Sequence, residues 1–267
     1  MKSLKYWLLV LGILSCFGCS SSIHEDNRGC SFICDSIQYR IEFMSAGCVR
    51  ILSYPEGDTL VTKRLVVDVE KPTFTDYKWE ETEQAFVFCT HELLVSFDKS
   101  DEAFTFREAS TGKLLLKEKD RRKARSFKRS EVGGEQCLEV TQRFIPTDEE
   151  AIYGLGQYQN GIMNYRGKSV LLLQANMDIV NPFLISTNGY GILWDNYSST
   201  KFEDTSEGYS FISEVGDASD YYFVYGKNMD EVVAGYRELT GDVPMFGKWV
   251  YGFWQSKERY KSFDELK

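Results

Sequence analysis

The chain has 267 residues, of which 43% are hydrophobic and 15% aromatic, enough to bury the core of one large β domain or two smaller ones. Its formal net charge of -9 argues against sequence-independent binding to nucleic acid, which requires clustered positive charge. We therefore expect a globular protein with no nucleic-acid partner.

The N-terminus is typical of an export signal. Two lysines precede an apolar run over residues 7–14 that is too short to span a bilayer permanently. Small residues and two cysteines follow, as in bacterial lipoprotein signals, and the pattern allows lipidation at either Cys16 or Cys19. An ordinary cleaved secretory signal is the alternative. We expect residues 1–19 to be the signal, and the protein to be exported and lipid-anchored in the bacterial cell envelope, in the periplasm or at the outer membrane.

The cysteines beyond the signal are odd in number, and no pair of C-x-x-C spacings indicates a zinc site. Export would permit disulfides, but at least one cysteine must stay free, and single cysteines in strands are usually small buried residues. We predict no functional thiol, no metal site and no cofactor. The five cysteines are Cys30, Cys34, Cys48, Cys89 and Cys137.

Most of the chain between residues 37 and 145 alternates apolar and polar residues with the period of a β-strand. Phe104 and Phe106, for example, alternate with Thr105 and Arg107, so that one face of the strand is buried and the other is wet. Close, fairly even spacing with turn residues between the runs predicts an antiparallel β-sandwich with few helices. The runs are IQYRIEF, CVRILSY, RLVVDV, AFVFCT, LLVSFD, AFTFRE, KLLLKE and LEVTQRF.

One stretch, residues 117–129, is rich in lysine and arginine. It reads KEKDRRKARSFKR, carries mixed charge and contains one aromatic residue, Phe127, unlike a platform on which nucleic-acid bases stack. We interpret it as a solvated loop between strands.

Residues 152–202 combine strand-length runs with turn residues and with many amide and aromatic side chains. The runs YGLGQ, SVLLLQ, FLIST and YGILWDN are separated by Asn-Gly at 160 and 188, Arg-Gly at 166 and Asn-Pro at 181, all typical of turns. Amides that donate and accept hydrogen bonds, beside flat aromatic faces, give the mixed surface that sugars require. The alternative is that the amides cap turns and the aromatic side chains fill a sandwich core. The amides are Gln157, Asn160, Asn164, Gln174, Asn176 and Asn196.

The period changes after a predicted strand pair over residues 209–225. Residues 228–239 place apolar side chains at helical spacing, with Asn228 as the N-cap and Gly241 at the end of the helix. The apolar run WVYGFW, residues 249–254, predicts a fully buried strand. Ser262 is a candidate cap for a second helix.

The order of these motifs resembles glycoside hydrolase family 31, and most of all its α-xylosidases. YGLGQ is followed by an NYRG turn, a Q-x-N strand, NPFLIST and GYGILWDN, and residues 239–266 resemble the passage from that family's N-terminal sandwich into its catalytic barrel. The resemblance implies a mainly β chain, with an antiparallel β-sandwich of the galactose-mutarotase type over residues 24–240. The truncated start of a (β/α)8 barrel would follow over residues 241–267, with residues 249–254 as its first strand.

The resemblance also implies a function. Family 31 enzymes are retaining α-glycosidases, and the α-xylosidase-like members remove terminal α-linked xylose or glucose from oligosaccharides such as xyloglucan fragments. They use two aspartates, a nucleophile and an acid/base, on later barrel strands. We therefore assign no catalytic residue here, and expect the chain to be inactive without a barrel, which a separate gene could encode. A loop or cap role is expected for each of Asp178, Asp195, Asp204 and Asp264.

By resemblance, this chain supplies part of the wall of the sugar pocket. Gln174 and Asn176 lie in a sandwich loop that contacts the terminal sugar, and the family's α-glucosidases tend to carry an aspartate where Asn176 aligns. Residues after the first barrel strand would flank the pocket. The alternatives are a non-catalytic carbohydrate-binding sandwich and an inactive remnant. The expected flanking residues are Trp254, Gln255, Lys257 and Arg259.

Overall fold

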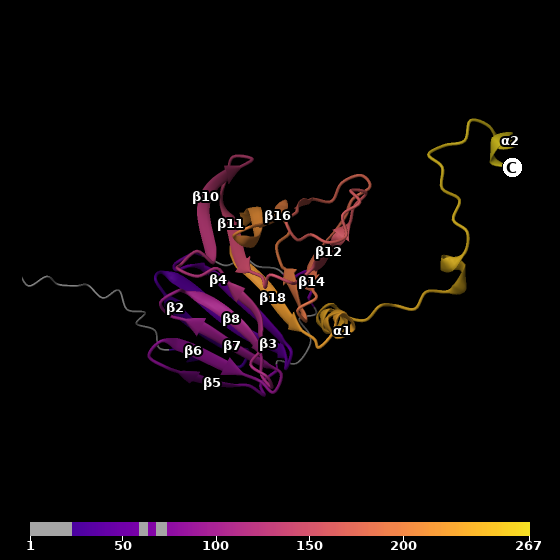
Figure 1. Ribbon diagram of the computed structural model, residues 1–267. Helices are drawn as coiled ribbons and strands as arrows, with labels where there is room; N and C mark the ends of the chain where they lie inside the picture. The colour runs from indigo at the N-terminus through magenta and orange to yellow at the C-terminus, as the bar shows by residue number, and fades with distance from the viewer. Residues whose placement is uncertain (1–22, 59–63, 68–73) are drawn as a thin grey trace, which may run out of the picture.

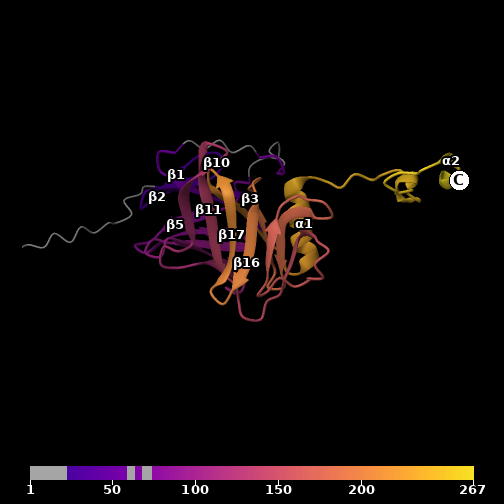
Figure 2. The same ribbon diagram turned by 90° about the horizontal axis from the view of Figure 1, so that it is seen from above.

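The computed structural model describes residues 23–58, 64–67 and 74–267, and the predicted signal with Cys16 and Cys19 lies outside this part of the chain. Two antiparallel sheets pack against each other, and a helix covers the outer face of one of them (Figures 1 and 2). The predicted antiparallel β-sandwich is thereby confirmed.

The first sheet combines strands from both ends of the sandwich. Its early and late strands meet where Tyr222 pairs with Arg50. Within the described residues its strands run in the order β1 (His24–Glu25), β2 (Cys30–Cys34), β3 (Ile37–Ser45), β4 (Cys48–Pro55), β18 (Ser219–Tyr225), β15 (Tyr190–Trp194), β14 (Ile179–Ser186) and β12 (Ile152–Gln157).

The second sheet contains the central run of short strands. β10 (Arg125–Val132) lies off its main path and forms with β11 a hairpin arm at the top of Figure 1. Within the described part of the chain the order is β13 (Ser169–Leu172), β16 (Thr200–Thr205), β17 (Gly208–Gly216), β11 (Glu135–Ile145), β9 (Leu114–Glu118), β8 (Ala103–Glu108), β7 (Leu93–Asp98), β6 (Ala85–Cys89) and β5 (Lys78–Glu81).

Aromatic side chains fill the space between the sheets. The predicted alternation holds on β8, where Phe104 and Phe106 are buried and Thr105 is partly exposed. The ring of Phe106 stacks on that of Phe223 from the first sheet, with 4.2 Å between centroids. Stacked pairs of this kind add to the free energy gained by burying apolar surface. The core therefore joins the two sheets directly.

One carboxylate lies inside this aromatic core. Glu118, at the end of β9, is 0% exposed. It accepts hydrogen bonds from Nε2 of Gln142 and from the hydroxyl group of Tyr221, both at 2.8 Å. It also accepts the backbone N–H of Phe104 at 2.7 Å and forms an ion pair with Arg125 of β10. A buried charge is tolerated when it is paired and hydrogen-bonded in this way.

The predicted helix, α1 (Met229–Thr240), covers the outer face of the first sheet. Asn228 Oδ1 accepts a backbone N–H of the first turn at 3.0 Å, and Gly241 ends the helix with a φ of 90°. Val232 and Leu239 are the buried residues of the helix. The predicted helix, its N-cap and its terminal glycine are all confirmed.

The prediction of a loop over residues 117–129 is wrong at both ends, since Lys117 and Glu118 belong to β9. β10 begins at Arg125, and its residues pair in unbroken register with β11, from Arg125 opposite Gln142 to Val132 opposite Glu135. Arg125 also enters the core to pair with Glu118, so charge in this stretch has a structural role that composition does not reveal.

Two other local predictions are wrong. The strand predicted from residue 64 is a bent segment over residues 64–67, held where Arg64 pairs with Glu42 at 2.6 Å, and its last two residues lie outside the described chain. Asn181-Pro182 lies inside β14, not in a turn. The pairing of β12 with β14 shifts register near this point, and proline is tolerated at such irregularities because no ladder hydrogen bond is required of it.

The segment after α1 leaves the sandwich and extends away from it in both views (Figures 1 and 2). The prediction of a buried strand over residues 249–254 is wrong, since Lys248–Tyr251 form a short 3-10 helix and Trp254 is 63% exposed. A buried strand needs neighbours that pair its backbone and cover its faces, and no described strand pairs with this run. Ser262 caps α2 (Phe263–Leu266) as predicted, and the barrel itself stays a prediction.

Gly156 on β12 is expected to accept no side chain. Its φ is 119°, and an added Cβ would lie 2.0 Å from the carbonyl oxygen of Ile179 on β14. Gly156→Ala should therefore lower the free energy of unfolding by at least about 2 kcal/mol, because left-handed strain adds to lost strand pairing. In the control Gly161→Ala, φ is 69° and no described atom lies within 4 Å of the new Cβ. Urea denaturation measures both variants, and equal losses would contradict the close approach of the two strands.

Candidate functional site

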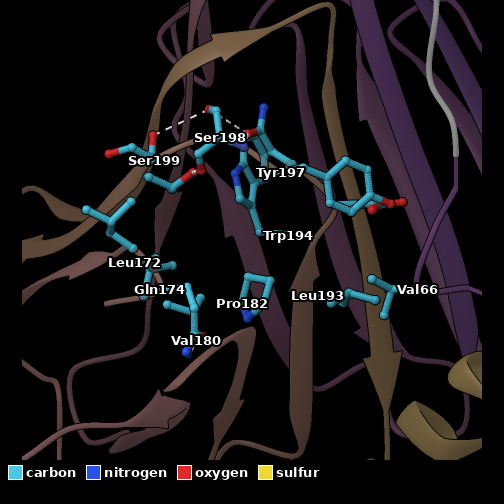
Figure 3. Close-up of a pocket in the computed structure, with 14 residues that line it drawn as sticks. Val66, Leu172, Gln174, Val180, Pro182, Leu193, Trp194, Tyr197, Ser198 and Ser199 are labelled. Atoms are coloured by element: carbon cyan, nitrogen blue, oxygen red, sulfur yellow. Dashed lines mark hydrogen bonds between the residues drawn. The ribbon is translucent and has the colours of Figure 1, made fainter. Parts of the chain in front are cut away.

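A pocket opens beside β14 and β15, between the loop that follows β13 and residues 195–200 (Figure 3). Its cavity volume is about 350 Å³. Proteins bind small ligands in cavities of about 300–1,000 Å³, so the size suits a ligand or a large side chain. Val180 and Pro182 contribute apolar wall on one side, and Tyr197 and Ser198 lie across from them.

The predicted sugar contact Gln174 lines this pocket, but its amide is used inside its own loop. Its Nε2 donates to the Asp178 carbonyl oxygen at 2.9 Å, and its Oε1 accepts the Val180 N–H at 3.1 Å. These two bonds close residues 174–180 into a hairpin loop. Gln174 therefore shapes the loop and presents few free hydrogen-bonding groups.

The second predicted contact, Asn176, lies at the tip of this hairpin loop. Ala175 bridges to Asp178, so Asn176 and Met177 form the turn between them, with a φ of 70° at Met177. Both turn residues are exposed, Met177 by 60%. The tip thus presents an amide beside an apolar side chain, and that pair can contact both the hydroxyl edge and the apolar face of a sugar.

Most polar groups on the opposite wall are bound within the protein. Asn196 donates to the Val215 carbonyl at 2.9 Å and accepts the Ser198 N–H at 2.8 Å. The Thr200 hydroxyl shares a hydrogen bond of 2.6 Å with the hydroxyl of Ser213. The surface that the pocket offers to a ligand is therefore mainly apolar.

Asp195 differs from these polar lining residues. It is partly buried, and its Oδ1 atom has no hydrogen-bond partner among the described residues. Burial, reinforced by the carboxylate of Asp220, raises the pKa of Asp195 to about 6, although a hydrogen bond with Tyr197 lowers it in part. The Tyr197 hydroxyl also accepts the Leu65 N–H at 2.8 Å. A carboxylate in this environment gains stability from any hydrogen-bond donor that reaches it.

The sequence predicted only a loop or cap role for Asp195. The position of Asp195 in the sequence could have indicated a further role, because Asp195 directly follows β15, all of whose residues are buried. A charged residue at that point must either leave the sheet or find a polar environment on it. The structure brings it beside Asp220 of the neighbouring strand, whose carbonyl oxygen accepts the Asp195 N–H at 2.9 Å.

A row of charges crosses the outer face of the first sheet next to Asp195. Arg50 donates to both carboxylate oxygens of Asp220, at 2.8 and 2.5 Å, and to Glu42 at 2.9 Å. Arg64 donates to Glu42 at 2.6 Å. Burial alone would raise the pKa of Glu42, but the guanidinium groups around it outweigh burial and lower its pKa to about 2. The arginines of this row are thus engaged with Glu42 and Asp220, and no described ion pair reaches Asp195.

The four predicted contacts in the C-terminal segment are not brought to the pocket. All of them are exposed, and the two that form side-chain hydrogen bonds to other side chains do so with neighbours in the same segment. In both views the segment lies far from the sandwich loops (Figures 1 and 2). Of the predicted site residues that the structure describes, only Gln174 and Asn176 therefore lie together, in the hairpin loop over residues 174–180. The four are Trp254, Gln255, Lys257 and Arg259.

The match to known proteins covers most of the sandwich. Residues 38–203, more than half of the chain, match the family described as the glycosyl hydrolase 31 N-terminal galactose mutarotase-like domain. The chain belongs to glycoside hydrolase family 31. The α-xylosidase of Saccharolobus solfataricus is 37% identical to this family 31 chain over 246 residues, which are 86% of the chain and 32% of the relative. The chain thus spans about a third of that relative's length.

Solved family 31 structures share the fold. A family 31 α-xylosidase from Xanthomonas citri superposes with a TM-score of 0.81 at 24% identity, over 91% of this chain and 43% of that one, a likeness of fold alone. A family 31 α-xylosidase from a soil metagenome, solved with xylose, gives a TM-score of 0.79 at 25% identity, over 92% and 38% of the two chains. The predicted resemblance and the sandwich of galactose-mutarotase type are confirmed.

Other features of this family 31 chain bear on what it can bind. Among the described residues, no group of three or more His, Cys, Asp or Glu side chains is arranged to hold a metal ion. No helix in the described ranges is long and apolar enough to cross a bilayer. In the described part of the chain, Cys30, Cys48, Cys89 and Cys137 are free thiols, and Cys30 and Cys48 are buried.

Proposed function

We propose that this chain is the N-terminal part of a retaining α-glycosidase that removes terminal α-linked xylose, or glucose, from oligosaccharides such as xyloglucan fragments. The observation that carries the proposal is the 37% identity to the S. solfataricus α-xylosidase over 86% of the chain. A catalytic barrel, in the same polypeptide or encoded separately, would complete the enzyme.

The proposed division of labour follows from the chemistry. Retaining hydrolysis needs two carboxyl groups about 5–5.5 Å apart, one as the nucleophile and one as the acid/base. We assign both to the barrel and neither to this chain. Asn176, at the tip of the hairpin loop, would exchange hydrogen bonds with a hydroxyl of the terminal sugar. The residues that would border the same sugar once the barrel is assembled are Trp254, Gln255, Lys257 and Arg259.

An assay with an aryl α-xyloside tests this division. The chain is measured alone and with the part of the S. solfataricus α-xylosidase that lies beyond the aligned region. Release of xylose only in the mixture supports the proposal. Release by the chain alone would show that catalytic carboxylates are present here after all. Inactivity in both samples, with sugar binding retained, would favour a non-catalytic carbohydrate-binding sandwich. Inactivity without sugar binding would favour an inactive remnant.

The contribution of Asn176 can be measured in the active mixture. Asn176→Ala should lower kcat/KM for the α-xyloside about 3- to 10-fold, because one hydrogen bond is worth about 0.5–1.5 kcal/mol. Asn160→Ala, at another exposed turn, is the matched control and should leave kcat/KM unchanged. Equal effects of the two substitutions would remove Asn176 from the sugar pocket.

We further propose that the protein is exported and held in the bacterial cell envelope by a lipid on Cys16 or Cys19. The supporting observation is the short apolar run followed by small residues and these two cysteines. Incorporation of labelled fatty acid is expected in the expressed chain, and it should disappear in one of the variants Cys16→Ser and Cys19→Ser. Labelling that survives both substitutions together would exclude this anchor.

A further inference from the structure

The hairpin loop over residues 174–180 connects the two sheets of the sandwich. Before it, at the end of β13, Leu172 pairs with Thr200 in the second sheet. After it, at the start of β14, Ile179 pairs with Gln157 in the first sheet. The described residues between these two pairs belong to neither ladder. Contacts within the loop must therefore fix their conformation.

The tip of the hairpin loop has a backbone conformation that its side chain does not favour. Met177 has a φ of 70°, in the left-handed region that residues other than glycine, asparagine and aspartate rarely adopt. A residue stays in such a conformation only when the structure around it determines the backbone. The bridge between Ala175 and Asp178 closes the turn directly around Met177. A second set of contacts joins this turn to the strand that follows it.

The amide of Gln174 supplies this second set of contacts. It donates to the carbonyl oxygen of Asp178 at 2.9 Å and accepts the backbone N–H of Val180 at 3.1 Å. The two bonds use both ends of one planar group, so they fix the two arms of the loop in distance and in direction. Figure 3 shows Gln174 beside Val180. A sugar hydroxyl would have to compete with the backbone of the loop for this amide.

We propose that Gln174 is a positioning residue that acts through Asn176. Its two hydrogen bonds hold the left-handed turn at Met177, and they thereby fix the direction in which the Asn176 amide meets the terminal sugar. A loop that is already ordered loses little conformational entropy when the sugar binds. The resemblance implied a direct sugar contact for Gln174, and this inference replaces that role. It rests on the proposed function, in which Asn176 contacts the sugar.

A double-mutant cycle in the active mixture with the barrel tests the inference. Gln174→Met keeps the length of the side chain and removes both hydrogen bonds. It should lower kcat/KM for the aryl α-xyloside about 3- to 10-fold, as Asn176→Ala does, because either change weakens the same sugar contact. In the Asn176→Ala background, Gln174→Met should lower kcat/KM by no more than about 2-fold. Gln84→Met, at the exposed turn between β5 and β6, is the matched control and should leave kcat/KM unchanged.

Two outcomes would overturn the inference alone. Losses that multiply in the double variant would mean that Gln174 contacts the sugar, or stabilises the chain, independently of Asn176. Hydrogen exchange of the chain alone gives a readout that does not depend on activity. The Val180 amide, which donates to Gln174 in the native chain, should exchange about 3- to 10-fold faster in Gln174→Met. Unchanged exchange is the second outcome that would overturn the inference.

Failure of the proposed function has a different signature. A mixture of the native chain and the barrel would then be inactive, even where the exchange of the Val180 amide still responds to Gln174→Met. That result would remove the sugar contact of Asn176 and with it the positioning role of Gln174.

Discussion

Arg50→Met is expected to lower the free energy of unfolding by about 3–5 kcal/mol, the cost of removing one partner from a buried ion pair. The Arg50 side chain is 4% exposed and holds the carboxylates of Glu42 and Asp220, which are 6% and 2% exposed. Without Arg50, these two buried carboxylates lose a shared cation. Methionine keeps the apolar stem, so the loss reports charge and not packing. Urea denaturation at neutral pH measures it.

Lys128→Met is the matched control for Arg50→Met. Lys128 is 73% exposed and pairs with Glu139 at 3.9 Å on the β10–β11 arm. An exposed pair of this kind contributes about 0–1 kcal/mol because water screens it and side-chain entropy opposes it. A loss as small for Arg50→Met would show that the buried row of charges adds no more than a surface pair does.

The row of charges around Arg50 should also affect how the free energy of unfolding depends on pH. The pKa of Glu42 in the folded chain is about 2, below its usual value of 4.5. A depressed pKa contributes stability that is present above the unfolded value and is lost as the pH falls from about 5 towards 2. In Arg50→Met the loss over this range should be smaller, because less of the cationic charge that lowers the pKa of Glu42 remains.

The architecture could be predicted because its signals are local. Alternation on β8 fixes which face carries Phe104 and Phe106, and a strand with that pattern buries one face wherever it is placed. The N-cap Asn228 and the terminal glycine Gly241 act within one turn of α1, so their sequence positions set the ends of the helix. Predictions of this kind need no knowledge of distant residues.

The features that sequence reasoning missed depend on partners far along the chain. The sequence placed Arg125 in a solvated charged loop. Local composition does not reveal its ion-pair partner Glu118 or the strand that pairs with β10. The apolar run 249–254 looked like a buried strand, but burial needs neighbouring strands that local apolarity cannot provide. Register and long-range pairing decided both cases.

The same limit applies to the candidate site. Gln174 and Asn176 were predicted from a motif, and the structure gives them different surroundings: Gln174 closes the hairpin loop, and Asn176 is exposed at its tip. The pKa of Asp195 is raised mainly by burial and further by the carboxylate of Asp220, which β18 places beside it. A motif can therefore identify the loop, while the chemistry of the pocket depends on the sheet.

Asp195→Asn is expected to stabilise the sandwich at neutral pH by up to about 3 kcal/mol, since one pKa unit corresponds to about 1.4 kcal/mol. Burial and the carboxylate of Asp220 raise the pKa of Asp195 from 3.8 to about 6, so ionisation is harder in the folded chain than in the unfolded one. Stability should therefore fall as the pH rises from about 4 to about 6. Asparagine carries no charge, so its contribution to the free energy of unfolding should be constant from about pH 4 to about pH 6.

Urea denaturation at pH values on both sides of this range separates the charge of Asp195 from its packing. The gain from Asp195→Asn should be large above about pH 6 and small below about pH 4, because the carboxyl group is neutral in both folded and unfolded chains at the acidic end. A variant that is less stable at neutral pH would mean that ionised Asp195 has a stabilising partner.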